Sequence, residues 1–165
     1  MLSIQIQDVK EFMNQLLRSD LFHPFYLWEA SIKTSVSYHI DGRLNQDFYN
    51  TEELETLPQT DYIPWAQIKP QIFSMIKGSK TPLSMKIILM LSNANTNQIL
   101  TKYNLPLSAE NINGLFLNIH YDGTNLSCTT GVSYRTFTLD KRLEAAFEEN
   151  ILNWLRQLNI AFLVH

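Results

Sequence analysis

The stretch LFLNIHYDGTNLSCTT, residues 115–130, decides the fold. Apolar and polar residues alternate on both sides of Asp122-Gly123, a pair typical of a tight β-hairpin turn. We expect Tyr121 to pair with Thr124 across this two-residue turn, so that Ile119 lies opposite Leu126. This register predicts one buried apolar face, made of Leu115, Leu117, Ile119, Leu126 and Cys128. The other face is predicted to be polar and to carry Asn118, His120, Asn125, Ser127 and Thr129.

The most regular helical pattern follows the hairpin. Asp140 is expected to cap this helix, and apolar residues then recur at steps of three and four: Leu143, Phe147, Ile151, Trp154, Leu155 and Leu158. We expect the apolar stripe to cover the buried face of the hairpin. On this arrangement the Trp154→Ala substitution costs about 3–5 kcal/mol of unfolding free energy.

Shorter patterns fill the rest of the chain. Strands are expected over residues 2–6, 25–40, 82–91 and 160–164, and the apolar run in 82–91 predicts an interior strand. Helices are expected over residues 9–19, 52–57, 69–78 and 95–102; Asp8 and Glu11 form a capping box for the first, and Lys69-Pro70 starts the third. The elements predict a single α+β domain over residues 1–165, with a mostly antiparallel sheet, helices packed on one face and a long C-terminal helix.

Composition and charge narrow the class of protein. The 165 residues are 45% hydrophobic and 18% charged, which excludes a disordered chain, a collagen and a coiled coil. No apolar run is long enough to cross a bilayer, so no membrane association is predicted. Residues 1–8 lack the basic and apolar regions of a signal peptide, and the chain has one cysteine. A cytoplasmic location is the simplest expectation.

The residues that carry chemistry form no recognised catalytic or metal-binding pattern. Cys128 and His120 are expected on opposite faces of the hairpin, so Cys128 is predicted to pack in the core. The four histidines are too far apart in sequence for a helical metal clamp, and neither a metal nor another cofactor is predicted. The KGSKT stretch at residues 77–81 lacks the glycine spacing of a phosphate-binding loop.

Charge is distributed unevenly along the chain. Residues 62–109 contain five lysines and no acidic residue, whereas residues 41–61 contain six acidic residues and one arginine. Such asymmetry is typical of an anion-binding patch, or of two surfaces that neutralise each other within the fold or across a dimer. The candidate ligand-binding residues are Lys77, Lys80, Lys86, His120 and Arg135.

Several motifs along the chain resemble those of a known group of proteins. They include DGR at 41–43, PW at 64–65, KGSKTP at 77–82, NGLFLNI at 113–119, CTTG at 128–131 and RTFTLDK at 135–141. Together they resemble an uncharacterised family of small proteins, a domain of unknown function from anaerobic Gram-positive bacteria. The resemblance spans nearly the whole chain and implies a bacterial cytoplasmic protein, without implying an activity.

Three functions are compatible with these patterns. The favoured one is a non-enzymatic cytoplasmic binding or protein-interaction module that self-associates through its acidic and lysine-rich segments. The first alternative is an enzyme whose site assembles near the hairpin at residues 115–138. The second alternative is anion or nucleic-acid binding through residues 62–109, although the net charge of −3 disfavours a nucleic-acid partner.

Overall fold

The computed structural model describes residues 1–57 and 60–165, and it confirms the α+β class. Within these residues, seven strands form one antiparallel sheet in the order β3-β2-β4-β5-β6-β1-β7. The strands are β1 (Ser3–Ile6), β2 (Phe25–Lys33), β3 (Ser37–Asp41), β4 (Ser84–Leu91), β5 (Ile112–Tyr121), β6 (Leu126–Tyr134) and β7 (Phe162–Val164). Strand β4 has neighbours on both sides, which confirms its predicted interior position.

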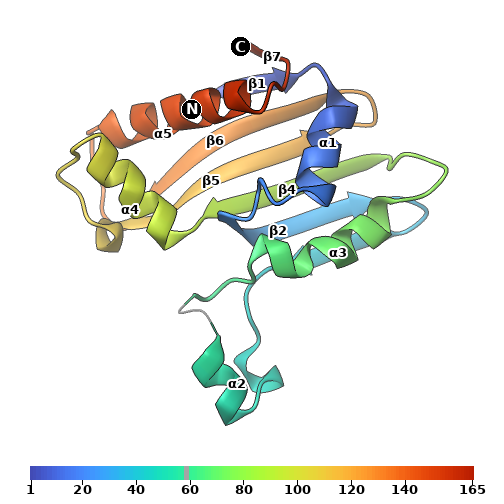
Figure 1. The fold of residues 1–165 in the computed structure, drawn as a ribbon, viewed down its shortest axis with the longest axis horizontal. Coiled ribbons are helices and arrows are strands. Elements are labelled where there is room, and N and C mark those ends of the chain that lie inside the picture. The colour runs from blue at the N-terminus through green and yellow to red at the C-terminus, as the bar shows by residue number, and fades with distance from the viewer. Residues whose placement is uncertain (58–59) are drawn as a thin grey trace.

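The helices that pack on the sheet lie on one side of it, as predicted. They are α1 (Val9–Arg18), α2 (Thr51–Thr56), α3 (Trp65–Ile76), α4 (Asn93–Lys102) and α5 (Arg142–Gln157), with short 3-10 turns η1 (Gln46–Phe48) and η2 (Ala109–Asn111). Figure 1 shows α1, α3, α4 and α5 over the same face, while α2 stands away from the body of the protein. The C-terminal helix α5 is present as expected and packs against β6. No helix in the described ranges has the length and apolar character needed to span a membrane.

The core lies between this face and the helices. Alternate strand positions supply its side chains, among them Ile4, Leu27, Ile87, Leu117, Ile119 and Cys128, all less than 2% exposed. Burying each large apolar side chain contributes about 1.5–3 kcal/mol. Apart from the buried Met90 and Gly114, the intervening positions of the interior strands are polar or half-buried, so most of the opposite face of the sheet stays open.

The hairpin has the predicted faces but a different register. Tyr121 pairs with Leu126, and Ile119 pairs with Cys128, so the expected pairing is shifted by two residues. The two loop residues are Gly123 and Thr124, because Asp122 N–H bonds the Asn125 carbonyl at 3.1 Å. The Asp122 carboxylate accepts from both Thr124 N–H and Asn125 N–H, and Gly123 has a φ of +102°. Glycine is common at the first position of a two-residue hairpin loop. A shift of the register by two residues leaves every side chain on its predicted face, because side chains alternate with a period of two.

Two other segments differ from the sequence-based expectation. The extended segment expected over residues 25–40 divides into β2 and β3, with a turn at residues 34–36 where Thr34 N–H bonds the Val36 carbonyl at 2.8 Å. Helix α3 starts at Trp65 rather than at Lys69-Pro70, and Pro70 lies inside it. The rigid φ of Pro64 suits the start of a helix, and one missing hydrogen bond at Pro70 is tolerated because the helix is held by packing.

The predicted helix caps are correct in part. Asp8 caps α1 by accepting from Glu11 N–H at 3.0 Å, but the Glu11 carboxylate accepts from Gln15 instead of completing a capping box. Helix α5 begins at Arg142, with Lys141 at the cap position that was expected for Asp140. Asp140 still accepts from Arg142 N–H and from its guanidinium, and these hydrogen bonds lower the pKa of Asp140 to about 2.

Trp154 is less central than the helical stripe suggests. Its ring is half-buried and packs edge-on against Phe22, with centroids 4.8 Å apart, and beside Phe25 at 5.9 Å. The fully buried tryptophan is instead Trp65, at the start of α3. The helical period identified the inward side of α5 correctly, but Trp154 lies where α5 reaches the edge of the core.

Candidate functional site

The helix-free face of the sheet presents a broad groove, which we call the Trp28 groove. It has a volume of about 570 Å³ and extends over β2, β4, β5 and β6 and the segment before α3. Its lining residues are Trp28, Arg43, Asp61, Tyr62, Ile88, Asn113, Phe116, Asn118, Gly131, Val132, Ser133 and Arg135. Neighbouring strands lie about 4.8 Å apart, so four strands make a floor about 14 Å wide.

An aromatic cluster forms one wall of the Trp28 groove. The rings of Trp28 and Tyr62 are stacked, with centroids 4.5 Å apart and an interplanar angle of 23°. Phe116 meets Trp28 edge-on at 5.0 Å. All three side chains are only half-buried, so part of each ring faces the groove. Half-exposed aromatic rings held by their neighbours give a ligand a rigid apolar surface.

The aromatic wall depends on an irregularity in β2. The pairing of β2 with β4 shifts between Leu27 and Glu29, which leaves Trp28 in a β-bulge. The segment that carries Tyr62 lies beside this bulge, because Ile63 N–H bonds the Gly42 carbonyl at 2.9 Å and Leu27 N–H bonds the Ile63 carbonyl at 2.9 Å. The backbone therefore sets the two aromatic rings against each other.

Two arginines flank the Trp28 groove. The Arg43 guanidinium lies 5.8 Å from the centre of the Tyr62 ring, and Arg135 follows the end of β6. Both are exposed, and within the described ranges neither guanidinium forms an ion pair with a carboxylate, although the Arg43 backbone N–H donates to Asp41 Oδ1 at 2.9 Å. Asp61 is the one carboxylate that lines the described part of the groove. An anionic group can therefore reach two guanidiniums that no ion pair neutralises.

The polar floor of the Trp28 groove is ordered by hydrogen bonds. Asn113 Nδ2 donates to Ser133 Oγ at 3.1 Å and to the Tyr134 carbonyl at 3.0 Å, while Asn118 Nδ2 donates to Thr129 Oγ1 at 3.3 Å. Each of these amides keeps its own carbonyl oxygen available to a ligand. Burial raises the pKa of the Tyr62 phenol, so its hydroxyl stays protonated at neutral pH.

Gly131 makes the floor hollow. It pairs with Phe116 across β5 and β6 and lies on the open face. A Cβ built at this position would meet only the Asn118 amide, at 4.0 Å. The space above Gly131 therefore belongs to the groove, and a larger side chain would fill it without disturbing the backbone.

The candidate residues from the sequence are not brought together at one place. Lys86 and His120 are direct cross-strand neighbours on the open face, and both are exposed. Arg135 lines the Trp28 groove on the same face. Lys77 and Lys80 lie on the helix side of the sheet, because the loop after α3 carries them to a different groove. The sequence-based set thus divides into two groups on opposite sides of the sheet.

Sequence reasoning missed Trp28, Tyr62, Phe116 and Arg43. The sequence did indicate Phe116 as unusual, because alternation along the strand places it on the same predicted polar face as Asn118 and His120. An aromatic residue on a polar face is a candidate for binding. No local pattern indicates the bulge at Trp28 or the position of Tyr62, which depend on contacts between distant segments.

The second groove lies between α1 and the C-terminal end of α3, and we call it the lysine groove. It has a volume of about 460 Å³. Its apolar lining comes from Val9, Met13, Leu17, Ile76, Pro82, Met85 and Tyr121. Three exposed lysines, Lys10, Lys77 and Lys80, line it as well, and its described lining contains no acidic residue.

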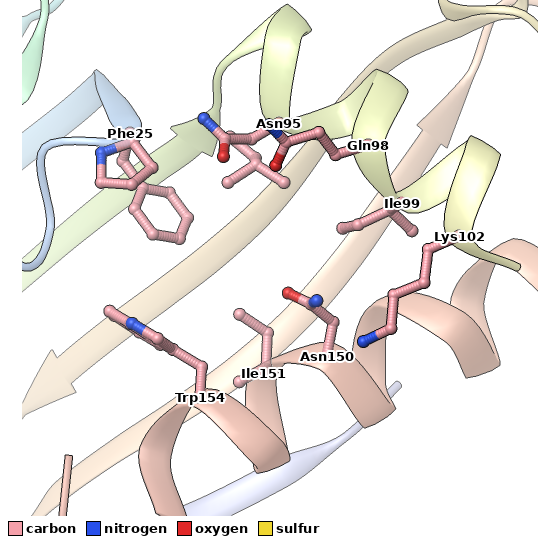
Figure 2. A pocket seen from close by; sticks show the side chains of 10 residues that line it. Phe25, Asn95, Gln98, Ile99, Lys102, Asn150, Ile151 and Trp154 are labelled. Carbon is pink, nitrogen blue, oxygen red and sulfur yellow. The ribbon is translucent and has the colours of Figure 1, made fainter. Parts of the chain in front are cut away.

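A smaller cavity of about 310 Å³ separates α4 from α5. Figure 2 shows Asn95, Gln98 and Lys102 reaching into it from α4, opposite Asn150 and Trp154 of α5. Phe25, Ile99 and Ile151 supply buried apolar lining. This cavity explains why Trp154 is only half-buried.

Cys128 has the structural role that the sequence predicts. Its side chain is 1% exposed, and burial raises the pKa of the thiol well above its ordinary value. His120 is exposed on the other face of the same hairpin, so it cannot act as a base for this thiol. In the described ranges, no cluster of three His, Cys, Asp or Glu side chains is placed to hold a metal ion.

Burial of Cys128 leads to a direct chemical prediction. The native protein is expected to resist alkylation by iodoacetamide and to react fully once unfolded in urea, because only the exposed thiolate is reactive. The Cys128→Ser substitution should lower the free energy of unfolding by about 1–3 kcal/mol, since it buries an additional polar hydroxyl. The His120→Ala substitution serves as the exposed control and should leave stability unchanged. Rapid alkylation of the folded protein would contradict this placement of Cys128.

Comparison with known proteins assigns the chain to a family. No curated protein and no solved structure matches it. The model of one family, described as a family of unknown function (DUF5721), matches residues 15–163, which include every helix after α1, strands β2 to β6 and most of β7. Because this match covers most of the sequence, the chain belongs to this family of unknown function.

Proposed function

We propose that the protein is a non-enzymatic binding module whose ligand occupies the Trp28 groove and carries both a planar ring and an anionic group. A nucleoside monophosphate represents this chemical class. The observation that carries the proposal is the half-exposed aromatic cluster of Trp28, Tyr62 and Phe116 beside two arginines without ion pairs. Each part of the groove fits a different part of such a ligand.

The ring of the ligand fits the aromatic wall. Stacking of a nucleobase on an aromatic side chain is worth about 1–3 kcal/mol, and it needs no specific base edge. The hollow above Gly131 leaves room for a flat group beside Phe116. Asp61 and the amide oxygens of Asn113 and Asn118 can accept hydrogen bonds from an exocyclic amine.

The anionic group fits the arginines. A guanidinium binds phosphate through two parallel hydrogen bonds, and such charge-assisted bonds are roughly twice as strong as neutral ones. Arg43 and Arg135 line the groove from different elements, so one of them can hold the phosphate while the ring contacts the aromatic wall. The overall charge of −3 favours a single anionic group over a long polyanion.

Isothermal titration calorimetry with adenosine monophosphate tests this proposal. We expect saturable binding to the wild type and weaker binding of adenosine or inorganic phosphate alone. The Arg135→Ala substitution should weaken binding about tenfold or more, because a hydrogen bond to a charged group contributes about 1.5–3 kcal/mol. The Gly131→Val substitution should abolish binding by filling the groove.

The control for this titration is Arg156→Ala, which removes an exposed arginine from α5 on the other side of the sheet. This variant should bind like the wild type. Absence of binding to the wild type, or equal binding by all variants, would overturn the proposal. Binding of a single-stranded oligonucleotide without binding of the mononucleotide would also contradict it and would favour the nucleic-acid alternative.

We further infer that the protein works in the cytoplasm. Its one thiol is buried and has no disulfide partner, which fits a reducing compartment. Cell fractionation with an antibody against the protein tests this location, and recovery outside the cytoplasmic fraction would contradict it.

A further inference from the structure

The strongest unexplained feature is the segment of residues 45–57, which we call the acidic arm. It contains η1 and α2, carries Asp47, Glu52, Glu53 and Glu55, and has no lysine or arginine. Every residue of α2 is exposed, and Figure 1 shows this helix standing away from the sheet and the other helices. An isolated helix shorter than about 12–15 residues is marginal in water, so a six-residue helix needs further contacts to be stable.

The acidic arm is held in position at its base. Leu44 N–H bonds the Asp61 carbonyl at 2.8 Å, and Arg43 forms an isolated bridge with Tyr62. The arm also exposes two large apolar side chains, Phe48 at 81% and Leu54 at 40%. Exposed apolar residues within an acidic surface are typical of a segment that docks into an apolar site with basic edges.

The lysine groove has the complementary chemistry. Its lining is mostly apolar, its charged residues are Lys10, Lys77 and Lys80, and no acidic residue lines its described part. Phe48 and Leu54 match the apolar lining, and the glutamates of α2 match the lysines. We propose that two copies of this chain associate by exchanging acidic arms, with each arm docked in the lysine groove of the other copy.

A second copy fits better than the arm of the same molecule. The arm returns to the body just before Trp65, where α3 begins, whereas the lysine groove lies at the opposite end of α3 beside Ile76 and Lys77. Twelve helical residues span about 18 Å, so the groove of the same molecule is far from the base of the arm. Reciprocal docking produces a closed two-fold dimer, in which both contacts are identical.

Charge reversal with rescue tests the arm exchange by sedimentation equilibrium. The wild type is expected to be a dimer whose dissociation constant rises with salt, because exposed charges are screened. The arm variant Glu52→Lys/Glu55→Lys and the groove variant Lys77→Glu/Lys80→Glu should each weaken self-association at least tenfold. Glu53 is left unchanged because it completes the capping box of α2 with Asn50. All four replaced side chains are exposed, so the variants should fold normally.

Mixing the two variants is the decisive experiment. In a mixed dimer the lysine arm meets the glutamate groove, and the native arm of the groove variant meets the native groove of the arm variant. Heterodimers should therefore form with an affinity close to that of the wild type, although each variant alone associates at least tenfold more weakly. The control variant Lys102→Glu/Arg156→Glu reverses two positive charges away from the groove and should dimerise like the wild type.

Any one of three results would overturn this proposal. The wild type could be monomeric at every concentration measured, either charge-reversed variant could self-associate as strongly as the wild type, or the mixture of the two variants could fail to form heterodimers. The Phe48→Ala/Leu54→Ala variant adds an independent check, because it should weaken the dimer without changing its charge. The arm-exchange proposal does not depend on which ligand the Trp28 groove binds, because the lysine groove that receives the arm lies on the other face of the sheet.

Discussion

Replacing Trp65 with alanine is expected to lower the free energy of unfolding by about 3–5 kcal/mol. The side chain is fully buried at the start of α3, and its Nε1 donates a hydrogen bond to the Leu16 carbonyl at 3.1 Å. Leu16 lies in the last turn of α1, where backbone carbonyls lack partners within the helix. Trp65 therefore fills the core and joins α3 to α1 at the same time.

Urea unfolding followed by far-ultraviolet circular dichroism measures this effect. Trp154→Ala is the matched control, because Trp154 is half-buried at the edge of the core and should lose less stability. The Trp65→Phe variant separates the two contributions, since it keeps most of the apolar burial and leaves the Leu16 carbonyl unpaired, at a cost of about 1–3 kcal/mol. A smaller loss for Trp65→Ala than for Trp154→Ala would show that this description of the core is wrong.

The Gly42→Ala substitution is expected to destabilise the protein by about 3 kcal/mol or more, because it places an atom inside a backbone contact. A Cβ at this position would lie 1.9 Å from the Leu27 carbonyl oxygen and 2.6 Å from its carbon. The backbone cannot move aside easily, since Gly42 N–H bonds the Trp28 carbonyl at 3.0 Å and the Gly42 carbonyl accepts from Ile63 N–H. The bulge at Trp28 and the position of Tyr62 depend on the same contacts.

Gly131→Ala is the matched control for this prediction. Its Cβ would meet only the Asn118 amide, at 4.0 Å, and glycine inside a strand is about 0.5–1 kcal/mol less favourable than alanine. This control should be neutral or slightly stabilising in urea unfolding. Gly42→Ala should also disturb the near-ultraviolet signal of the aromatic cluster, because the stacked rings lose their alignment. Equal stability of the two glycine variants would contradict the close approach at Gly42.

The parts of the fold that could be predicted are those in which apolar residues recur with the period of a strand or a helix. Alternation in β5 and β6 identified the buried face correctly, because a shift of two residues preserves it. The turn at residues 34–36 was missed because it contains neither glycine nor proline. The apolar stripe identified the side of α5 that faces the core. How much of the Trp154 side chain is buried depends on the neighbouring elements that pack against it, which the stripe does not show.

The candidate site was less predictable than the fold, since it is assembled from distant segments. Lys77, Lys80 and Lys86 are close in sequence, but the loop after α3 and the alternation of β4 place them on opposite sides of the sheet. Trp28, Tyr62 and Phe116 come together only through the bulge in β2 and the contact at Gly42. Such contacts leave no periodic signal in a single sequence.

The positions of the three tryptophans have a practical consequence. Trp28 lies in the open groove, Trp65 is fully buried in the core, and Trp154 lies beside the cavity between α4 and α5. The three indoles should therefore differ in their wavelength of maximum fluorescence emission and in their accessibility to a collisional quencher such as acrylamide. Variants that keep one indole at a time turn the protein into a set of intrinsic optical probes, each reporting on a separate region without an added dye.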